Sequence, residues 1–303
     1  FRFLAGVSLA GTYMPGLKML TDRIEGPRQS RYLSFYTASF SLGAALSTAL
    51  SGAIGHAFGP DGAFAMAATC SLFGVVLVVL GTRPRPVTAP GGSANPLPAL
   101  YAAARNRQAL AYSLGYAAHM WELHGFRAWL VAYLVFASTG ALAPSGDASL
   151  AFWGSLILVL GMPASIIGNE FALRIGRRRL LYIVMMLSGL LAVGFGAASQ
   201  LPFAAVLLLG AIYSWFVTAD SASLTAGAVE RALPGQRGAT MAMHSLLGFG
   251  AASLGPLAFG AVLDAGGDAA AGSWLGGFAI LAAGVLTGPV ILRLMLPSED
   301  RVS

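Results

Sequence analysis

The sequence predicts an all-α polytopic membrane protein, and three observations support this prediction. Hydrophobic residues make up 56% of the chain, charged residues only 10%, and the mean hydropathy is +0.72, so too little polar surface exists to cover a water-soluble domain. Apolar stretches recur along the whole chain, and most reach the roughly 20 residues that a helix needs to cross a ~30 Å hydrocarbon core. Basic residues occupy only every second gap between these stretches.

We expect nine membrane-spanning helices, at residues 1–20, 32–56, 62–81, 108–138, 149–169, 180–199, 202–229, 238–264 and 273–295. All but two of the 18 Lys and Arg residues lie in the gaps that follow the odd-numbered helices. The positive-inside rule places these gaps and the C-terminus in the cytoplasm. The two exceptions, Arg2 and Arg127, lie inside apolar stretches.

A segment rich in Pro, Gly and Ser divides the chain. We expect a cytoplasmic linker at 83–107, between three spans of an N-terminal helical bundle at 1–82 and a C-terminal six-helix bundle at 108–303. Within the linker, apolar residues opposite Arg105 favour a short interfacial helix over 97–107. Because Phe1 already lies in an apolar stretch and no initiator Met precedes it, we expect the chain to be the downstream part of a longer protein.

The remaining composition limits the kinds of function. A single cysteine, Cys70, excludes an intrachain disulfide and cannot build a metal site. The net charge of +6 is spread over alternate loops, which favours topology and anionic lipid over nucleic acid. No hydrolase, nucleotide-binding or redox motif is present, so we expect no enzyme activity and no cofactor, and transport powered by a gradient.

Three local patterns resemble motifs of one family, the major facilitator superfamily of permeases. Residues 168–179 resemble its cytoplasmic loop motif G-x-x-x-D-R-x-G-R-R, with matches at Arg174, Gly176, Arg177 and Arg178. Leu173 stands at the acidic position, and Glu170 is the nearby substitute. Residues 2–6 resemble the fourth-span motif R-x-x-Q-G, with Ala5 at the Gln position. Residues 255–260 resemble the G-P-x-x-G-G element of the family's antiporters.

This resemblance implies the fold and the general function. The chain would be an N-terminally truncated permease, with spans four to twelve of a twelve-helix bundle, and would act as a secondary active transporter by alternating access. We expect a monomer in the inner membrane of a bacterium, with the lipid bilayer, a small-molecule solute and protons as its partners. Symport and antiport stay open.

Ionisable side chains inside the bilayer cost at least ~2.5–3.5 kcal/mol each, so they mark candidate functional sites. Glu122 lies roughly 21 Å along the fourth span, and Arg127 lies about 140° around the helix from it. We expect Glu122 to be the proton-coupling carboxylate and Arg127 a substrate or gate contact, with static interhelical pairing as the alternative for both. His119 shares the face of Glu122 and is either a relay or a packing residue.

Asp220 and His244 lie in the seventh and eighth spans, and we expect them to hydrogen-bond to each other as a structural or a coupling pair. By the resemblance, Arg2 would line the central cavity. Two buried arginines favour a small organic anion as the solute. The alternatives are a multidrug or metabolite efflux antiporter, in which Glu122 and Asp220 receive cations, and a non-transporting membrane sensor or scaffold.

Overall fold

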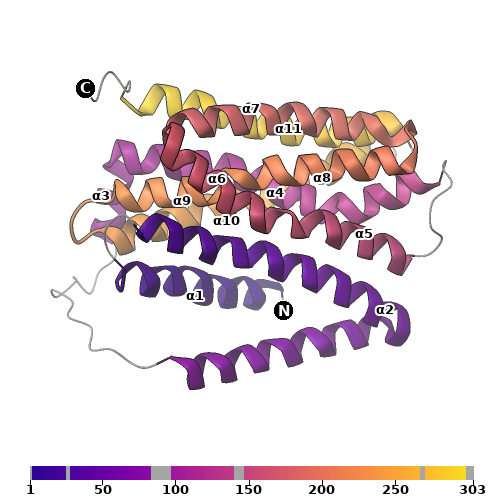
Figure 1. Ribbon diagram of the computed structural model, residues 1–303, viewed down its shortest axis with the longest axis horizontal. Coiled ribbons are helices and arrows are strands. Elements are labelled where there is room, and N and C mark those ends of the chain that lie inside the picture. The colour runs from indigo at the N-terminus through magenta and orange to yellow at the C-terminus, as the bar shows by residue number, and fades with distance from the viewer. Residues whose placement is uncertain (1, 25–27, 83–96, 140–146, 267–269, 298–303) are drawn as a thin grey trace.

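The computed structural model describes residues 2–24, 28–82, 97–139, 147–266 and 270–297. The predicted all-helical fold is confirmed for these residues (Figure 1). Their helices are α1 (Arg2–Thr21), α2 (Gln29–Gly81), α3 (Leu97–Arg105), α4 (Arg107–Ser138), α5 (Asp147–Val159), α6 (Gly161–Ile175), α7 (Arg177–Ala197), the 3-10 helix η1 (Ala198–Gln200), α8 (Phe203–Ala219), α9 (Ser221–Glu230), α10 (Arg237–Gly266) and α11 (Ala271–Met295).

Three of the helical stretches are interrupted. The backbone of α2 breaks at Gly59, where φ is 72°, and Pro60 follows, so this helix folds back on itself and contains two of the expected spans (Figure 1). Helices α5 and α6 form one apolar stretch, Ser149–Ile175, and α8 and α9 form another, Phe203–Glu230. A helix break in a membrane protein leaves backbone N–H and C=O groups without their helical hydrogen bonds. Such a break is tolerated where it faces protein or a cavity.

Six helical stretches of the described residues are long and apolar enough to span a membrane. The expected spans that form α1 and α4 do not meet that measure. Helix α4 carries the buried polar residues Ser113, His119 and Glu122, and more than half of its residues are buried. It packs against α10 and α11 on one side and α9, α8 and α5 on others. Protein therefore surrounds its polar groups instead of lipid.

The N-terminal helices contact the rest of the protein through α1 and the first arm of α2. That arm, at 29–58, packs against α5, α6 and α9, while α1 lies against α10. The second arm, at 60–81, lies apart from the other helices (Figure 1) and exposes apolar side chains such as Leu80, which is 81% exposed. Of the expected linker, 83–96 lies outside the described residues, and 97–105 forms the short helix α3.

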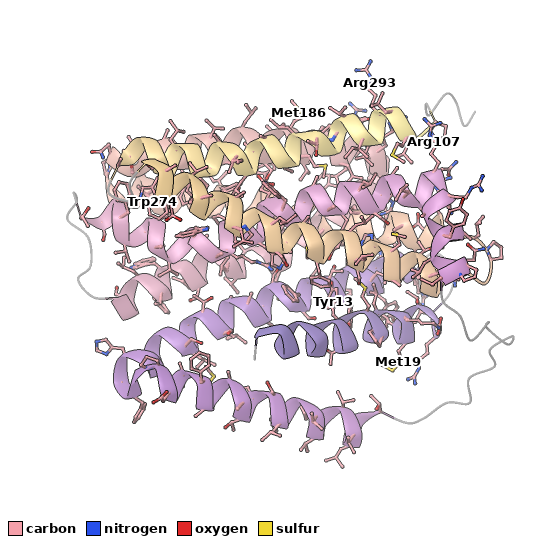
Figure 2. The ribbon with its side chains drawn as sticks, turned by 180° about the vertical axis from the view of Figure 1, so that it is seen from behind. Tyr13, Met19, Arg107, Met186, Trp274 and Arg293 are labelled. Atoms are coloured by element: carbon pink, nitrogen blue, oxygen red, sulfur yellow. The ribbon has the colours of Figure 1, made fainter. Side chains whose placement is uncertain are left out.

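The helices alternate in direction, so the basic gaps gather at one end of the bundle. Arg107 at the start of α4 and Arg293 near the end of α11 lie at this end, and Trp274 near the start of α11 lies toward the other (Figure 2). Asn106 fixes the start of α4 there: its side chain accepts a hydrogen bond from the Ala109 amide and donates one to the Arg231 carbonyl.

We predict that the two ends of the bundle face opposite sides of the membrane. In a Cys70→Ala background, cysteines placed at Pro234, in the exposed basic turn between α9 and α10, and at Gln200, in the exposed turn before α8, provide the test. In inverted and right-side-out vesicles, an impermeant maleimide should label Pro234→Cys from the cytoplasmic side and Gln200→Cys from the outer side. Labelling of both from the same side would contradict the topology.

Candidate functional site

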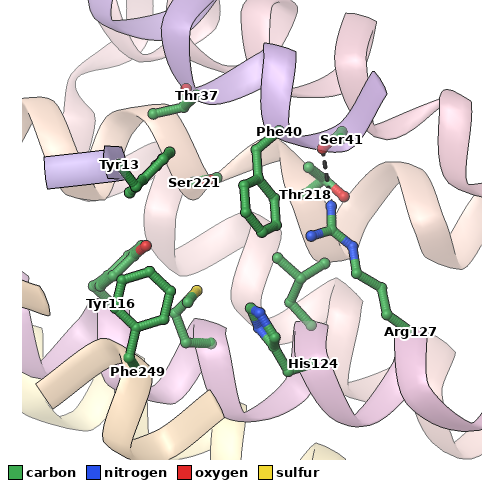
Figure 3. Close-up of a pocket in the computed structure, with 12 residues that line it drawn as sticks. Tyr13, Thr37, Phe40, Ser41, Tyr116, His124, Arg127, Thr218, Ser221 and Phe249 are labelled. Atoms are coloured by element: carbon green, nitrogen blue, oxygen red, sulfur yellow. Dashed lines mark hydrogen bonds between the residues drawn. The ribbon is translucent and has the colours of Figure 1, made fainter. Parts of the chain in front are cut away.

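The N-terminal helices and the C-terminal helices enclose a narrow cavity (Figure 3). Its volume is about 20 Å³, which holds about one water molecule, so this conformation is closed around the cavity. Helices α1 and α2 line one side, and α4, α8, α9 and α10 line the other. The lining residues are Tyr13, Thr37, Phe40, Ser41, Tyr116, Met120, Leu123, His124, Arg127, Thr218, Ser221 and Phe249.

Arg127 reaches from α4 across the cavity to α2 (Figure 3). Its Nη2 donates a hydrogen bond of 3.0 Å to Ser41 Oγ, and its Cζ lies 5.2 Å from the centre of the Phe40 ring, within cation–π range. Its Nε and Nη1 are buried and have no hydrogen-bond partner among the described residues. A guanidinium presents its donors in a planar fork that matches a carboxylate. Arg127 is therefore a candidate anion anchor.

An aromatic wall and a histidine complete the cavity. The Tyr13 ring lies 5.6 Å from the Phe40 ring and 6.2 Å from the Phe249 ring, so side chains of α1, α2 and α10 meet there. His124 lies 6.3 Å from Phe40, and its buried Nδ1 has no hydrogen-bond partner within the described ranges. None of the twelve described lining residues carries a carboxylate. The cavity thus offers positive charge, hydroxyl groups and aromatic surface.

Glu122 lies outside this cavity, within the C-terminal helices. It is 1% exposed, and its two carboxyl oxygens accept hydrogen bonds from Ser188 Oγ of α7 at 2.8 Å and from the Tyr213 hydroxyl of α8 at 3.1 Å. Glu122 and Arg127 form no ion pair with each other, as their separation around α4 predicts. The coupling role expected for Glu122 stays a prediction, and its contacts are those of a polar bridge between helices.

Asp220 pairs with His119, and the predicted hydrogen bond from Asp220 to His244 is wrong. Asp220 Oδ1 lies 2.7 Å from His119 Nδ1, and both side chains are at most 2% exposed. This is an ion-pair distance, but the angles do not make a hydrogen bond, and Nδ1, Nε2 and Oδ1 have no other partner in the described part of the chain. Counting along one helix gives the depth of Asp220 but does not determine which neighbouring helix its side chain meets.

His244 occupies a separate polar position beside this pair. Its Nε2 lies 3.4 Å from Thr225 Oγ1, and its Nδ1 lies 3.3 Å from Ser113 Oγ. Its ring stacks on the ring of Tyr116 at 4.0 Å, and Tyr116 also stacks on His119 at 5.8 Å. Tyr116 lines the cavity, so it connects both buried histidines with it.

The comparison with protein families decides between the possible kinds of membrane protein. The family model described as Major Facilitator Superfamily matches residues 1–219, more than half of the chain. The chain belongs to the major facilitator superfamily. Its members transport small-molecule solutes across lipid bilayers. A comparison with curated proteins finds no match.

The superfamily match includes the cytoplasmic loop motif, and the structure shows what these residues contact. Gly176 is the single residue between α6 and α7, with φ at 89°, a conformation that favours glycine because it has no Cβ. Arg177 pairs with Glu230 and donates to the Ser223 carbonyl, and Arg178 donates to the Tyr182 hydroxyl and the Pro297 carbonyl. Arg174 is exposed. These contacts hold the start of α7 to α9 and to the end of α11.

Glu170, the substitute acid of this motif, joins α6 to α2. Its two oxygens accept hydrogen bonds from Arg31 Nε at 2.6 Å and Arg31 Nη2 at 3.0 Å. In the same interface, the preceding residues of the two helices also pair: Ser30 Oγ donates to Asn169 Oδ1 at 3.0 Å, and Asn169 Nδ2 donates to the Ser30 carbonyl at 3.2 Å. Glu170 therefore connects α6 of the C-terminal helices to α2, which lines one side of the cavity.

The sequence analysis did not select the residues that α1 and α2 contribute to the cavity. Thr37, Phe40 and Ser41 occur at helical spacing i, i+3 and i+4, so they lie on one face of an apolar span. A face with two hydroxyl groups and an aromatic ring in such a span is a sequence signal for a cavity-lining surface. Tyr13 gave no comparable signal. The side chain of Arg2, which the resemblance places in the cavity, lies outside the described side chains.

We predict that Glu122 stabilises the bundle through its two hydroxyl partners. Glu122→Ala should lower the free energy of unfolding by roughly 1–3 kcal/mol, because it leaves the buried Ser188 and Tyr213 hydroxyls unpaired. Glu122→Gln should lose less, because an amide can pair with both and a hydroxyl can donate or accept. Thermal unfolding in detergent measures both. Glu230→Ala, at an exposed ion pair, is the matched control and should lose at most about 1 kcal/mol. Equal losses for Glu122→Ala and the control would contradict the bridging role.

Proposed function

We propose that this superfamily member is a proton-coupled secondary transporter that moves a small organic anion by alternating access, with Arg127 as the anion anchor. The single observation that carries the proposal is the state of the Arg127 side chain. Two of its guanidinium nitrogens are buried against the cavity without a partner in the described residues. A buried donor without a partner costs about 1–3 kcal/mol, and more when it is charged. A bound anion would supply the missing partner.

The character of the cavity also favours an anion over a cation. A cation is bound by carboxylates or aromatic rings, but the described lining residues include no carboxylate, and the positive charge of Arg127 already lies over the Phe40 ring. Glu122 and Asp220, which the efflux alternative assigns to cations, both have partners behind the lining. The aromatic wall of Tyr13, Phe40 and Phe249 favours an anion with an apolar or planar body.

Alternating access is supported by the position of the contacts between α2 and α6. Arg31 and Glu170 lie at the basic end of the bundle, and the cavity lies deeper between the same groups of helices. Their side chains are 57% and 31% exposed, so the ion pair contributes at most about 1 kcal/mol. A contact this weak can close the basic end in one state and separate in another. We call Arg31, Glu170, Ser30 and Asn169 the α2–α6 latch.

The first prediction from this proposal concerns anion binding. Benzoate, lactate or succinate should raise the unfolding temperature of the purified full-length protein, whereas the neutral analogue benzamide should not. Arg127→Gln should abolish this stabilisation. Arg127→Lys should weaken it, because an ammonium group cannot reproduce the planar fork.

Arg293→Gln, at an exposed position near the end of α11, removes the same charge and is the matched control. It should keep the wild-type response. Undiminished stabilisation of Arg127→Gln would rule out Arg127 as the anchor. In proteoliposomes, an imposed pH gradient should drive uptake of the anion that binds, and absence of any flux would favour the non-transporting alternative.

The second prediction concerns the α2–α6 latch. A cysteine at Ser221, which lines the cavity, reports access from the basic end in a Cys70→Ala background. Arg31→Ala should raise the rate of its modification by an impermeant methanethiosulfonate about two- to fivefold, the factor that corresponds to the loss of about 0.4–1 kcal/mol. The double exchange Arg31→Glu with Glu170→Arg should restore the slow rate.

Lys18→Ala is the matched control for the latch. This substitution breaks the exposed ion pair between Lys18, in α1, and Asp22, the residue after the end of α1. That ion pair connects no two helices. The modification rate in Lys18→Ala should equal that of the parent. If the double exchange behaves like Arg31→Ala, the pairing of Arg31 with Glu170 does not hold the basic end closed.

A further inference from the structure

A buried ion pair without a structural explanation lies directly behind the cavity. His119 and Asp220 are 0% and 2% exposed, and their facing atoms are 2.7 Å apart. Replacing such a pair with apolar residues often costs nothing or stabilises the fold, so stability does not account for it. The imidazole nitrogen that does not face Asp220, His119 Nε2, is also buried and has no hydrogen-bond partner in the described ranges. The pair is thus suited to gaining and losing a proton.

The pair has a short route to the cavity. Thr218 and Ser221 flank Asp220 on either side of the break between α8 and α9, and both line the cavity. On the other side, Tyr116 lines the cavity and stacks on His119. A proton that enters the cavity with water therefore has only this layer of side chains to cross.

The charged and titratable groups around the pair come from four helices. On α4, His124 lies within electrostatic range of both His119 and Arg127, and Arg127 in turn lies within range of Tyr13 of α1 and of Tyr116. On α10, His244 lies within range of His119. Glu122 lies within range of Asp220, and Tyr213 of α8 is its hydrogen-bond partner.

A net charge is costly in a buried region. This cost links the charge of the His119–Asp220 pair to the charge at Arg127. With neutral His119, the pair carries one negative charge, which balances the positive charge of Arg127 when the cavity is empty. An anion on Arg127 neutralises that positive charge and leaves the pair uncompensated. Binding one proton to His119 then makes the pair an imidazolium beside a carboxylate, with no net charge. The charges of Arg127, the anion and the His119–Asp220 pair therefore sum to zero in both states.

We propose that the His119–Asp220 pair carries the transported proton, and that an anion on Arg127 promotes its uptake, so that the protein is a proton–anion symporter. This inference rests on the proposed function and names the proton site within it. The proton binds at an imidazole nitrogen of His119 and leaves to water on the other side of the membrane once the anion has departed.

The test uses the full-length protein and benzoate, lactate or succinate, whichever gives the largest stabilisation. In the wild type, affinity for this anion should fall as pH rises, by up to tenfold per pH unit, because a proton binds with the anion. Weakly buffered solution should show an uptake of up to one proton per anion. Asp220→Asn removes the negative charge that a proton on His119 would neutralise, so the anion affinity of this variant should not vary with pH and its proton uptake should vanish.

Transport assays separate binding from coupling. Asp220→Asn should keep anion counterflow in proteoliposomes and lose uphill uptake driven by a pH gradient. Asp264→Asn, at the exposed end of α10, is the matched control and should keep both activities. If Asp220→Asn does not fold, His119→Gln combined with Asp220→Asn also leaves no net charge and should behave in the same way.

Each outcome has a definite meaning. A wild-type pH slope and intact uphill uptake in Asp220→Asn would overturn the proton site, and loss of both only in Glu122→Gln would move it to Glu122. Anion affinity in the wild type that is independent of pH would overturn the symport. If none of the three anions stabilises the wild type, the proposed anion site itself fails, which is a different result from failure of the proton site.

Discussion

The cost of holding polar and charged side chains away from water governs the organisation of this protein. Helix α4 carries Glu122, Arg127 and His119, and it lies among α5, α8, α9, α10 and α11 instead of facing lipid. Each of these side chains then depends on a partner from another helix: hydroxyl groups for Glu122, Ser41 for Arg127 and Asp220 for His119. The arrangement of the surrounding helices follows from this requirement.

Close packing and helix breaks make these contacts possible. The backbone of α6 at Gly168 approaches the Ala219 carbonyl so closely that a Cβ there would collide with it. This contact lies next to the break at Asp220 and holds α9 where its first residue reaches the cavity. Small residues at helix interfaces serve the same purpose throughout membrane proteins, because lipid supplies no hydrophobic force between helices.

The cavity needs a change of shape before it can bind a solute, and the α2–α6 latch is weak enough to permit that change. The cavity contains Arg127 with two unpaired donors and has little free volume, so it requires both an anion and a change of shape to be filled. The latch is a partly exposed ion pair next to the Ser30–Asn169 contact, and its low strength permits that change of shape. Because the latch and the cavity both lie between α2 and the C-terminal helices, an anion in the cavity can alter the latch contacts.

The sequence alone determined the membrane class, the order of the spans, the superfamily and the helices that carry the ionisable groups. Hydropathy and charge are properties of a segment, so they can be read without knowledge of its neighbours. The sequence also predicted that Glu122 and Arg127 do not pair with each other, because their separation around α4 follows from the pitch of one helix.

Only the tertiary structure decided the partners of these groups. Asp220 faces His119 of α4 and not His244 of α10, and Glu122 of α4 faces Ser188 of α7 and Tyr213 of α8. Tyr13, Phe40 and Ser41 became cavity residues only when α1 and α2 were placed against α4 and α10. Lateral packing depends on the shapes of several helices at once, and no single segment encodes it.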